Sequence, residues 1–393
     1  MSDAQTWVIQ TEDLQVGTSL SFDLADANGQ VLLKAGVPIQ ERLKELLRKK
    51  NIHSVTVRGA ANSEADKSEA TLLSSYATER IEAIQSAIAS TQDSIVRLVQ
   101  STQQGLPSGV DELGKSVDQF LVEANKDIAA TLALCGLPSK VVNPSISERL
   151  VARATKLSLL GIVMSVLRKD EARESLDIGM AGALHDSSLI IHPEWFSKEK
   201  TPRDESIMKE YRRHPLESAE MLNGVEGISK NAISIISQVH EQADGSGYPR
   251  GMQLKQSYPG AIILNLADAY LELTFPIQGT PIDRSDSIAY LAHHAALGKF
   301  CKSTFFLFMN GISLYPIGSS VILDDDSKAI VIQSNDGYPL KPVVRLLHES
   351  HSTKLDLKQS KLTIARPADG VLAFGSERIK KSQMQNVLWR TDH

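Results

Sequence analysis

The pattern of apolar and polar positions changes twice along the chain, and each change predicts a different kind of structure. The first sixty residues mix two periods, because residues 20–24 alternate as in a half-buried strand and residues 39–50 follow a helical spacing. From residue 71 to residue 310 the period is helical almost throughout. Beyond Tyr315 it falls to two, as in short strands. We therefore expect a mainly α protein with a small sheet-containing region at each end.

These changes set the domain boundaries that we expect. The stretch at residues 60–70 is small, polar and charged, which is typical of a linker. We predict a small α+β domain over residues 1–60, a linker and long helices over 61–140, a helical bundle over 141–313, a small β-barrel or meander over 314–372, and a polar tail over 373–393.

The long helix expected over residues 71–100 carries an apolar face. Ile81, Ile88 and Ile95 repeat every seven residues along it. Such a repeat favours either a homodimer through this helix or a helix pair within one chain. The sequence leaves both alternatives open.

Composition excludes several classes of protein. Among the 393 residues, 42% are hydrophobic and 23% are charged, which is the balance of a folded soluble protein. The net charge of -5 gives no electrostatic reason to bind DNA or an anionic membrane. Cys135 and Cys301 form no CxxC pair, residues 1–10 lack a signal pattern, and the longest apolar stretches, such as 304–309, fall far short of the ~20 residues that span a bilayer. We expect a cytoplasmic protein.

Candidate chemistry lies in the helical region. The adjacent His185 and Asp186 end the apolar segment AGALHD, His214 follows 29 residues after His185, His240 follows 26 residues later, and Asp268 another 28 residues later. Imidazole and carboxylate groups bind Fe, Mn or Zn, and a carboxylate can bridge two such ions. Two bridged ions activate water for in-line attack at phosphorus and take up the developing charge. The spacing alone does not decide between such a site and ordinary helix-end residues.

The loop that follows His240 makes the pattern specific. Residues 240–251 read HEQADGSGYPRG, with AGALHD upstream and LADAY downstream. Together these segments resemble the HD-GYP family of bacterial metal-dependent phosphohydrolases over about residues 143–318. The resemblance implies an HD-superfamily helical bundle, two or three divalent metal ions, and hydrolysis of cyclic di-GMP within bacterial signalling.

The resemblance also implies roles for individual residues. His185 and Asp186 would form the catalytic dyad, with Asp186 bridging two ions. Asp268 would complete the first ion's ligands, and His214 and His240 would bind the second. The loop residues that the resemblance links to substrate or to a signalling protein partner are Asp244, Gly247, Tyr248, Pro249 and Arg250.

Five features depart from the family pattern. Ser147 and Val239 each stand where a histidine ligand is usual, Leu189 replaces a lysine after the dyad, and Ile262 replaces an arginine. An expected Arg-Tyr-Lys cluster is not recognisable in residues 274–284. Each metal ion would lose one histidine, and the reacting phosphate would lose two cations.

Three functions therefore remain open. The first is an active phosphodiesterase on cyclic di-GMP or a related cyclic dinucleotide, using a metal-activated water and one or two ions of Fe, Mn or Zn. The second is a catalytically degenerate HD-GYP module that senses a nucleotide or docks a protein. A hydrolase with one metal ion and another substrate is a third. We expect His192 and the pair His293–His294 on the surface, and not as substitute ligands.

Overall fold

The chain folds into two compact units in the computed structural model. One comprises residues 1–71 with 139–145, and the other comprises residues 72–138 with 146–393. The residues that the structure describes are 6–11, 14, 23–26, 29–34, 37, 39–50, 52–58, 64–137, 141, 144–196, 205–279, 281–347 and 353–368. The expected polar tail at 373–393 lies outside them.

The first unit pairs one helix with an antiparallel sheet. Its elements are β1 (Thr6–Gln10), β2 (Asp23–Ala25), β3 (Val31–Leu33), α1 (Glu41–Lys49) and β4 (Ser54–Arg58). The sheet order is β1-β4-β2-β3. Leu47 of α1 packs with Leu24 and Val55 of the sheet, because the spacing of Leu43 and Leu47 places both on one helical face.

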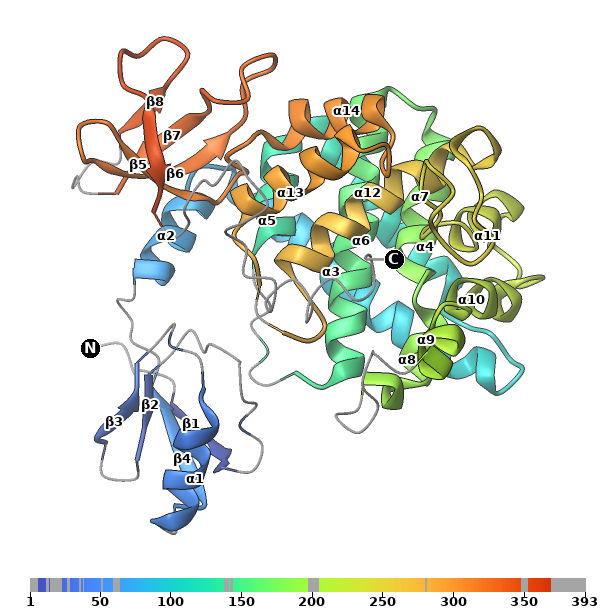
Figure 1. Ribbon diagram of the computed structural model, residues 1–393, viewed down its shortest axis with the longest axis horizontal. Helices are drawn as coiled ribbons and strands as arrows, with labels where there is room; N and C mark the ends of the chain where they lie inside the picture. The colour runs from blue at the N-terminus through green and yellow to red at the C-terminus, as the bar shows by residue number, and fades with distance from the viewer. Residues whose placement is uncertain are drawn as a thin grey trace. The chain divides into compact units, whose positions relative to one another are not determined.

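The second unit is mainly helical, as the sequence predicts (Figure 1). Its helices, together with the one that leads into it, are α2 (Glu64–Leu73), α3 (Thr78–Gln103), α4 (Val110–Lys126), α5 (Ile128–Gly136), α6 (Ile146–Arg168), α7 (Ala172–Leu184), α8 (Ser187–Ile191), α9 (Glu205–Tyr211), α10 (His214–Leu222), α11 (Lys230–Ile236), α12 (Pro259–Thr274), α13 (Arg284–Ala296) and α14 (Lys302–Ile312). Residues 64–70, which we expected in a linker, instead form most of α2.

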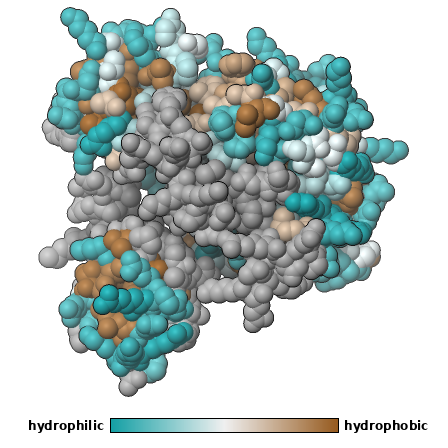
Figure 2. All heavy atoms as spheres, viewed as in Figure 1, coloured by the Kyte–Doolittle hydropathy of each residue, from teal (hydrophilic) through white to brown (hydrophobic). Residues whose placement is uncertain are grey.

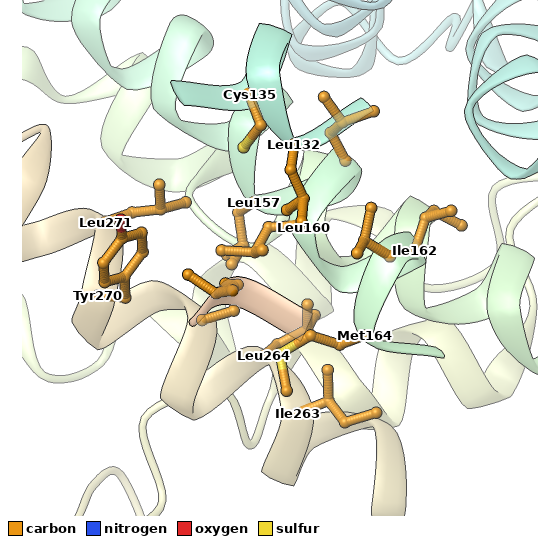
Figure 3. Packing of buried hydrophobic residues seen from close by; sticks show 14 of the residues in the cluster. Leu132, Cys135, Leu157, Leu160, Ile162, Met164, Ile263, Leu264, Tyr270 and Leu271 are labelled. Atoms are coloured by element: carbon orange, nitrogen blue, oxygen red, sulfur yellow. The ribbon is translucent and has the colours of Figure 1, made fainter. Parts of the chain in front are cut away.

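Helix α6 is the centre of the bundle and packs against α7, α12, α4 and α5. Figure 3 shows Leu157, Leu160 and Met164 of α6 beside residues of α5 and α12. By length and composition α6 could cross a membrane, so the expectation that no apolar stretch approaches that length was wrong. In the structure 78% of its apolar window is buried, which is what a core helix requires. The described surface in Figure 2 mixes hydrophilic with hydrophobic residues.

The apolar face of α3 is buried within the same chain. Ile81 and Ile84 pack against Ala130 and Leu134 of α5, while the C-terminal half of α3 packs against α4. Of the two alternatives for this face, the structure contains the helix pair within one chain.

The C-terminal region is an antiparallel sheet. Its strands are β5 (Ser320–Leu323), β6 (Lys328–Gln333), β7 (Val343–Leu346), β8 (Lys354–Asp356) and β9 (Ile364–Pro367), in the order β8-β7-β6-β5-β9. Strands β5 to β8 form a meander and β9 returns to the far side of β5. The described strands form an open sheet, and a closed barrel stays a prediction. Val321, Ile330 and Val344 belong to the same apolar core as the helices.

Candidate metal centre

Five sequence-predicted residues lie in or directly beside five helices and meet at one place. His185 ends α7 and Asp186 immediately precedes α8. His214 is the first residue of α10, His240 follows α11, and Asp268 lies in the middle of α12. The bundle therefore gathers residues that are up to 83 positions apart in the sequence.

Asp186 lies between two histidines. Its Oδ2 is 3.2 Å from Nε2 of His185, and its Oδ1 is 3.3 Å from Nε2 of His214. Asp268 also faces two histidines, with Oδ1 3.8 Å from Nε2 of His185 and Oδ2 3.5 Å from Nδ1 of His240. Nε2 of His214 and Nε2 of His240 are 3.1 Å apart. All five side chains thus point at one small volume.

Backbone carbonyl groups fix the orientation of two of these histidines. Nδ1 of His185 is 2.9 Å from the carbonyl oxygen of Gly182, and Nδ1 of His214 is 2.8 Å from that of Tyr211. Because a carbonyl oxygen can only accept, each Nδ1 carries the proton and each Nε2 presents its lone pair to the centre. This is how proteins orient histidines that bind metal ions.

The donor set fits a divalent ion. Nε2 of His185 is buried without a hydrogen-bond partner among the described residues, although it faces two carboxylates. Donor atoms of His185, Asp186 and His240 lie within 4.8 Å of one another. Each of the five residues is at most 5% exposed. Carboxylates that are buried in this way need a nearby cation. Imidazole and carboxylate donors suit Fe, Mn and Zn alike.

The loop after His240 folds back onto the backbone of the residues that precede it. A Cβ atom added at Gly247 would lie 2.2 Å from the backbone nitrogen of Gln242 and 2.4 Å from the carbonyl oxygen of His240. The backbone N–H of Tyr248 donates to that same carbonyl oxygen at 3.1 Å. Only glycine permits this approach.

Glu241 holds the other end of the loop. Its two carboxylate oxygens accept hydrogen bonds from the backbone N–H groups of Arg250 and Met252, at 2.8 and 2.7 Å. Asp244 accepts from the backbone N–H of Ser246 at 2.9 Å, which is a local turn contact. Both acidic side chains therefore shape the loop.

The predicted loop residues separate into inward and outward positions. Tyr248 is 6% exposed, and its ring stacks on that of His240 with centroids 4.8 Å apart. Asp244 and Arg250 are exposed, whereas Gly247 and Pro249 are half-buried. The tyrosine thus contacts a histidine of the candidate centre, and Arg250 is an exposed cation of the loop.

The positions that depart from the family pattern are occupied by packing residues. Leu189 is fully buried in a cluster with Leu150, Tyr211 and Tyr248. Val239 lies in the main core, and Ile262 is half-buried on α12. An apolar wall therefore stands where the resemblance would place a lysine.

Two further charged residues, which the sequence pattern does not predict, lie in this site. Arg153 on α6 is 2% exposed and donates through Nη2 to Oδ1 of Asp268. Its Nη1 is ion-paired with Oε2 of Glu272, which is also 2% exposed. The available signal was the pair of acids Asp268 and Glu272, one turn apart on the otherwise apolar α12, since such a pair requires a cation nearby.

The histidines that we expected outside the site lie outside it. His192 is exposed and stacks on Trp195, with ring centroids 6.0 Å apart. His293 is exposed on α13, and Nδ1 of His294 contacts the carbonyl oxygen of Tyr290 at 3.0 Å. Ser147 is half-buried in the first turn of α6.

Comparisons with known proteins find similarity over the same region of the chain. Residues 136–300 match the HD domain family. A cyclic di-GMP phosphodiesterase of Pseudomonas aeruginosa is 23% identical over 235 residues, which are 59% of this chain and 56% of that protein. The cyclic di-GMP phosphodiesterase PdeB of Borreliella burgdorferi is 22% identical over 175 residues, 44% of this chain and 46% of that protein. These matches support an HD-GYP family assignment for the matched region.

The match to these relatives is partial. The chain spans about half the length of the curated relatives it matches. Among solved structures, the HDG"Y"P protein Bd1817 from Bdellovibrio bacteriovorus has a TM-score of 0.46 and 15% identity, covering 77% of this chain and 98% of that one.

Proposed function

We propose that the central HD-GYP domain is a divalent-metal-dependent phosphodiesterase acting on cyclic di-GMP or a related cyclic dinucleotide. The observation that carries the proposal is Asp186 held between His185 and His214, both of which present Nε2 lone pairs. Two curated relatives that carry the name cyclic di-GMP phosphodiesterase support the substrate class. A divalent ion bound here would activate water and stabilise charge at phosphorus.

The chain's own residues hold this centre in place before any substrate arrives. The carbonyl groups of Gly182 and Tyr211 prevent His185 and His214 from rotating, so the donor atoms are fixed by the bundle. Tyr248 stacks on His240 and excludes water from one of its faces. Arg250, which follows two residues after this tyrosine, is exposed and offers a cation to a substrate phosphate.

We expect this phosphodiesterase to be slow. Leu189 provides no positive charge or hydrogen-bond donor to a phosphate, and losing one such group typically costs ~10²–10³-fold in turnover. The five centre residues are also at most 5% exposed, so neighbouring segments must move before a dinucleotide reaches them. Both features lower the rate without removing the metal centre.

The same two features favour a second candidate function. A metal-bound HD-GYP module without turnover would keep Asp186 and its histidines as a structural centre. It would then sense a nucleotide or dock a signalling protein through the loop at residues 244–250. A cytoplasmic location and a homodimer remain predictions for either function.

Replacing the central carboxylate tests the proposal. In Asp186→Asn the affinity for Mn²⁺ should fall by at least ~10–100-fold, because the residue between two histidines loses its charge. Hydrolysis of cyclic di-GMP should be lost with it. Asp286→Asn is the matched control: this aspartate lies on α13 away from the centre and should keep both metal and turnover.

Metal content and product release should be measured on the same preparations, under Mn²⁺ and under anaerobic Fe²⁺. Metal bound by the wild type and lost in Asp186→Asn, together with measurable linear dinucleotide or GMP, supports the phosphodiesterase. Metal without any product would instead establish the second candidate. A wild-type protein that binds no ion contradicts both.

A further inference from the structure

A buried arginine lies inside the metal centre. Arg153 extends from α6, and its guanidinium binds the carboxylates of Asp268 and Glu272 on α12. All three residues are 2% exposed, so water screens these contacts little. Arginine keeps its positive charge in such surroundings.

The guanidinium binds an oxygen that a metal ion would need. Oδ1 of Asp268 accepts the hydrogen bond from Nη2 of Arg153, and this same oxygen lies 3.8 Å from Nε2 of His185. An ion shared by His185 and Asp268 through that oxygen would sit beside a fixed positive charge. Like charges repel strongly at such short range in a dry interior.

One divalent ion is enough to neutralise the charged side chains of the centre. Three buried carboxylates, those of Asp186, Asp268 and Glu272, carry three negative charges, and Arg153 carries one positive charge. Histidines are neutral when they bind a metal. Buried Glu241 binds two backbone N–H groups of its loop and lies outside this balance. Two negative charges remain, which one divalent ion neutralises.

We propose that Arg153 takes the place of one of the two metal ions, so that the chain holds a single divalent ion. That ion is bound by Asp186 and the histidines around it, while the guanidinium neutralises Asp268 and Glu272. This inference rests on the proposed metal centre and specifies its stoichiometry. It makes Arg153 a positioning residue for Asp268.

Removing the guanidinium should change both metal content and stability. The full chain should bind about one Mn²⁺, and Arg153→Met should bind about two, because Asp268 and Glu272 are then released for a second ion. In metal-free buffer the thermal midpoint of Arg153→Met should fall, since two buried carboxylates face each other without a cation. Added Mn²⁺ should restore that midpoint more strongly in the variant than in the wild type.

Two further variants separate charge from packing. Arg149→Met is the matched control, because Arg149 lies one turn earlier on α6 and donates to the carbonyl oxygen of Ile277 at 3.2 Å. It should keep one ion per chain. Arg153→Lys retains the charge and should also keep one ion. If Arg153→Met fails to fold, Glu272→Gln provides the test: it removes one negative charge and should weaken Mn²⁺ binding several-fold.

Several outcomes would contradict the inference that Arg153 replaces one of two metal ions. Two ions per wild-type chain would do so while leaving the proposed metal centre intact. So would an Arg153→Met protein that folds and takes up no more metal than the wild type, or unchanged Mn²⁺ affinity in Glu272→Gln. A wild-type chain without any bound ion would overturn both this inference and the proposed function.

Discussion

At the scale of single residues, Gly247 shows how closely the loop and the metal centre are built together. An added methyl group would overlap the backbone of Gln242 and His240, and backbone cannot move aside as a flexible side chain can. The loop would have to shift, and His240 would shift with it.

We therefore expect Gly247→Ala to lower the free energy of unfolding by about 1–3 kcal/mol, which is the usual range for overpacking. Urea unfolding followed by circular dichroism measures the change. Gly114→Ala is the control, because nothing lies within 4 Å of its added Cβ and alanine is favoured within α4. That variant should gain about 0.5–1 kcal/mol. Equal effects at the two sites would contradict this account.

The sequence could predict which residues gather at the candidate centre but not their cationic partner. The segments AGALHD, HEQADGSGYPRG and LADAY resemble a known family, and the bundle brings their His185, His240 and Asp268 together with His214. Arg153 follows no such motif, and a lone arginine in a helix is ordinarily a solvated residue. Only the three-dimensional packing of α6 against α12 reveals that its guanidinium points inward.

At the scale of elements, the helix boundaries depend on polar capping side chains, which the spacing of apolar residues does not reveal. The stretch 110–134 has a nearly continuous helical pattern, yet α4 and α5 separate at Asp127. The Asp127 carboxylate accepts a hydrogen bond from the backbone N–H of Ala130 at 3.0 Å and so begins a new helix. The apolar period does not mark this boundary, because the break interrupts no apolar position.

Helix α13 begins with two neighbouring acids, and this gives it a pH dependence. Asp283 caps the helix by accepting from the backbone N–H of Ser285 at 2.8 Å. Burial, and secondly the charge of Asp283, raise the pKa of half-buried Asp286 to about 6. The folded state thus holds this proton more tightly than the unfolded chain, whose carboxyl groups titrate near pH 4.

It follows that the contribution of Asp286 to stability is present below pH 4 and is lost as the pH rises through 6. Asp286→Asn removes this loss. The thermal midpoint of the variant, relative to the wild type, should therefore be higher at pH 7.5 than at pH 4.5. Scanning calorimetry at both pH values checks it. A difference between the two proteins that does not change with pH would refute the assignment.

At the scale of the whole molecule, the C-terminal sheet and the helices share one core. Tyr315, Ile317 and Val321 are buried in the same cluster as α6 and α12. The hydroxyl group of Tyr76, just before α3, donates to the carbonyl oxygen of Ile332 in β6 at 2.5 Å. The change of period at residue 315 predicts strands, but it does not reveal that their apolar face packs on the helices.

Truncation tests this shared core. A chain that ends at Ser313 loses several buried apolar side chains, each worth about 1.5–3 kcal/mol, and their sum approaches the stability of a whole domain, roughly 5–15 kcal/mol. We expect it to lose cooperative thermal unfolding. A chain that begins at Leu72 removes most of the first compact unit instead and should keep its thermal midpoint and metal content. Cooperative unfolding of the chain ending at Ser313 would contradict the shared core.

The hydrogen bond and the ring stacking that join Tyr248 to His240 determine how this domain could respond to a signal. The loop residue donates to the carbonyl oxygen of the metal-centre residue and stacks on its ring, so neither moves alone. Ion binding and loop opening are therefore two legs of one thermodynamic cycle. A molecule that opens the loop must lower the affinity of the centre for the ion. By the same factor, a bound ion must lower the affinity of the loop for that molecule. Through this reciprocity, occupancy of the proposed ion site would change when a molecule binds the loop at the surface of the protein.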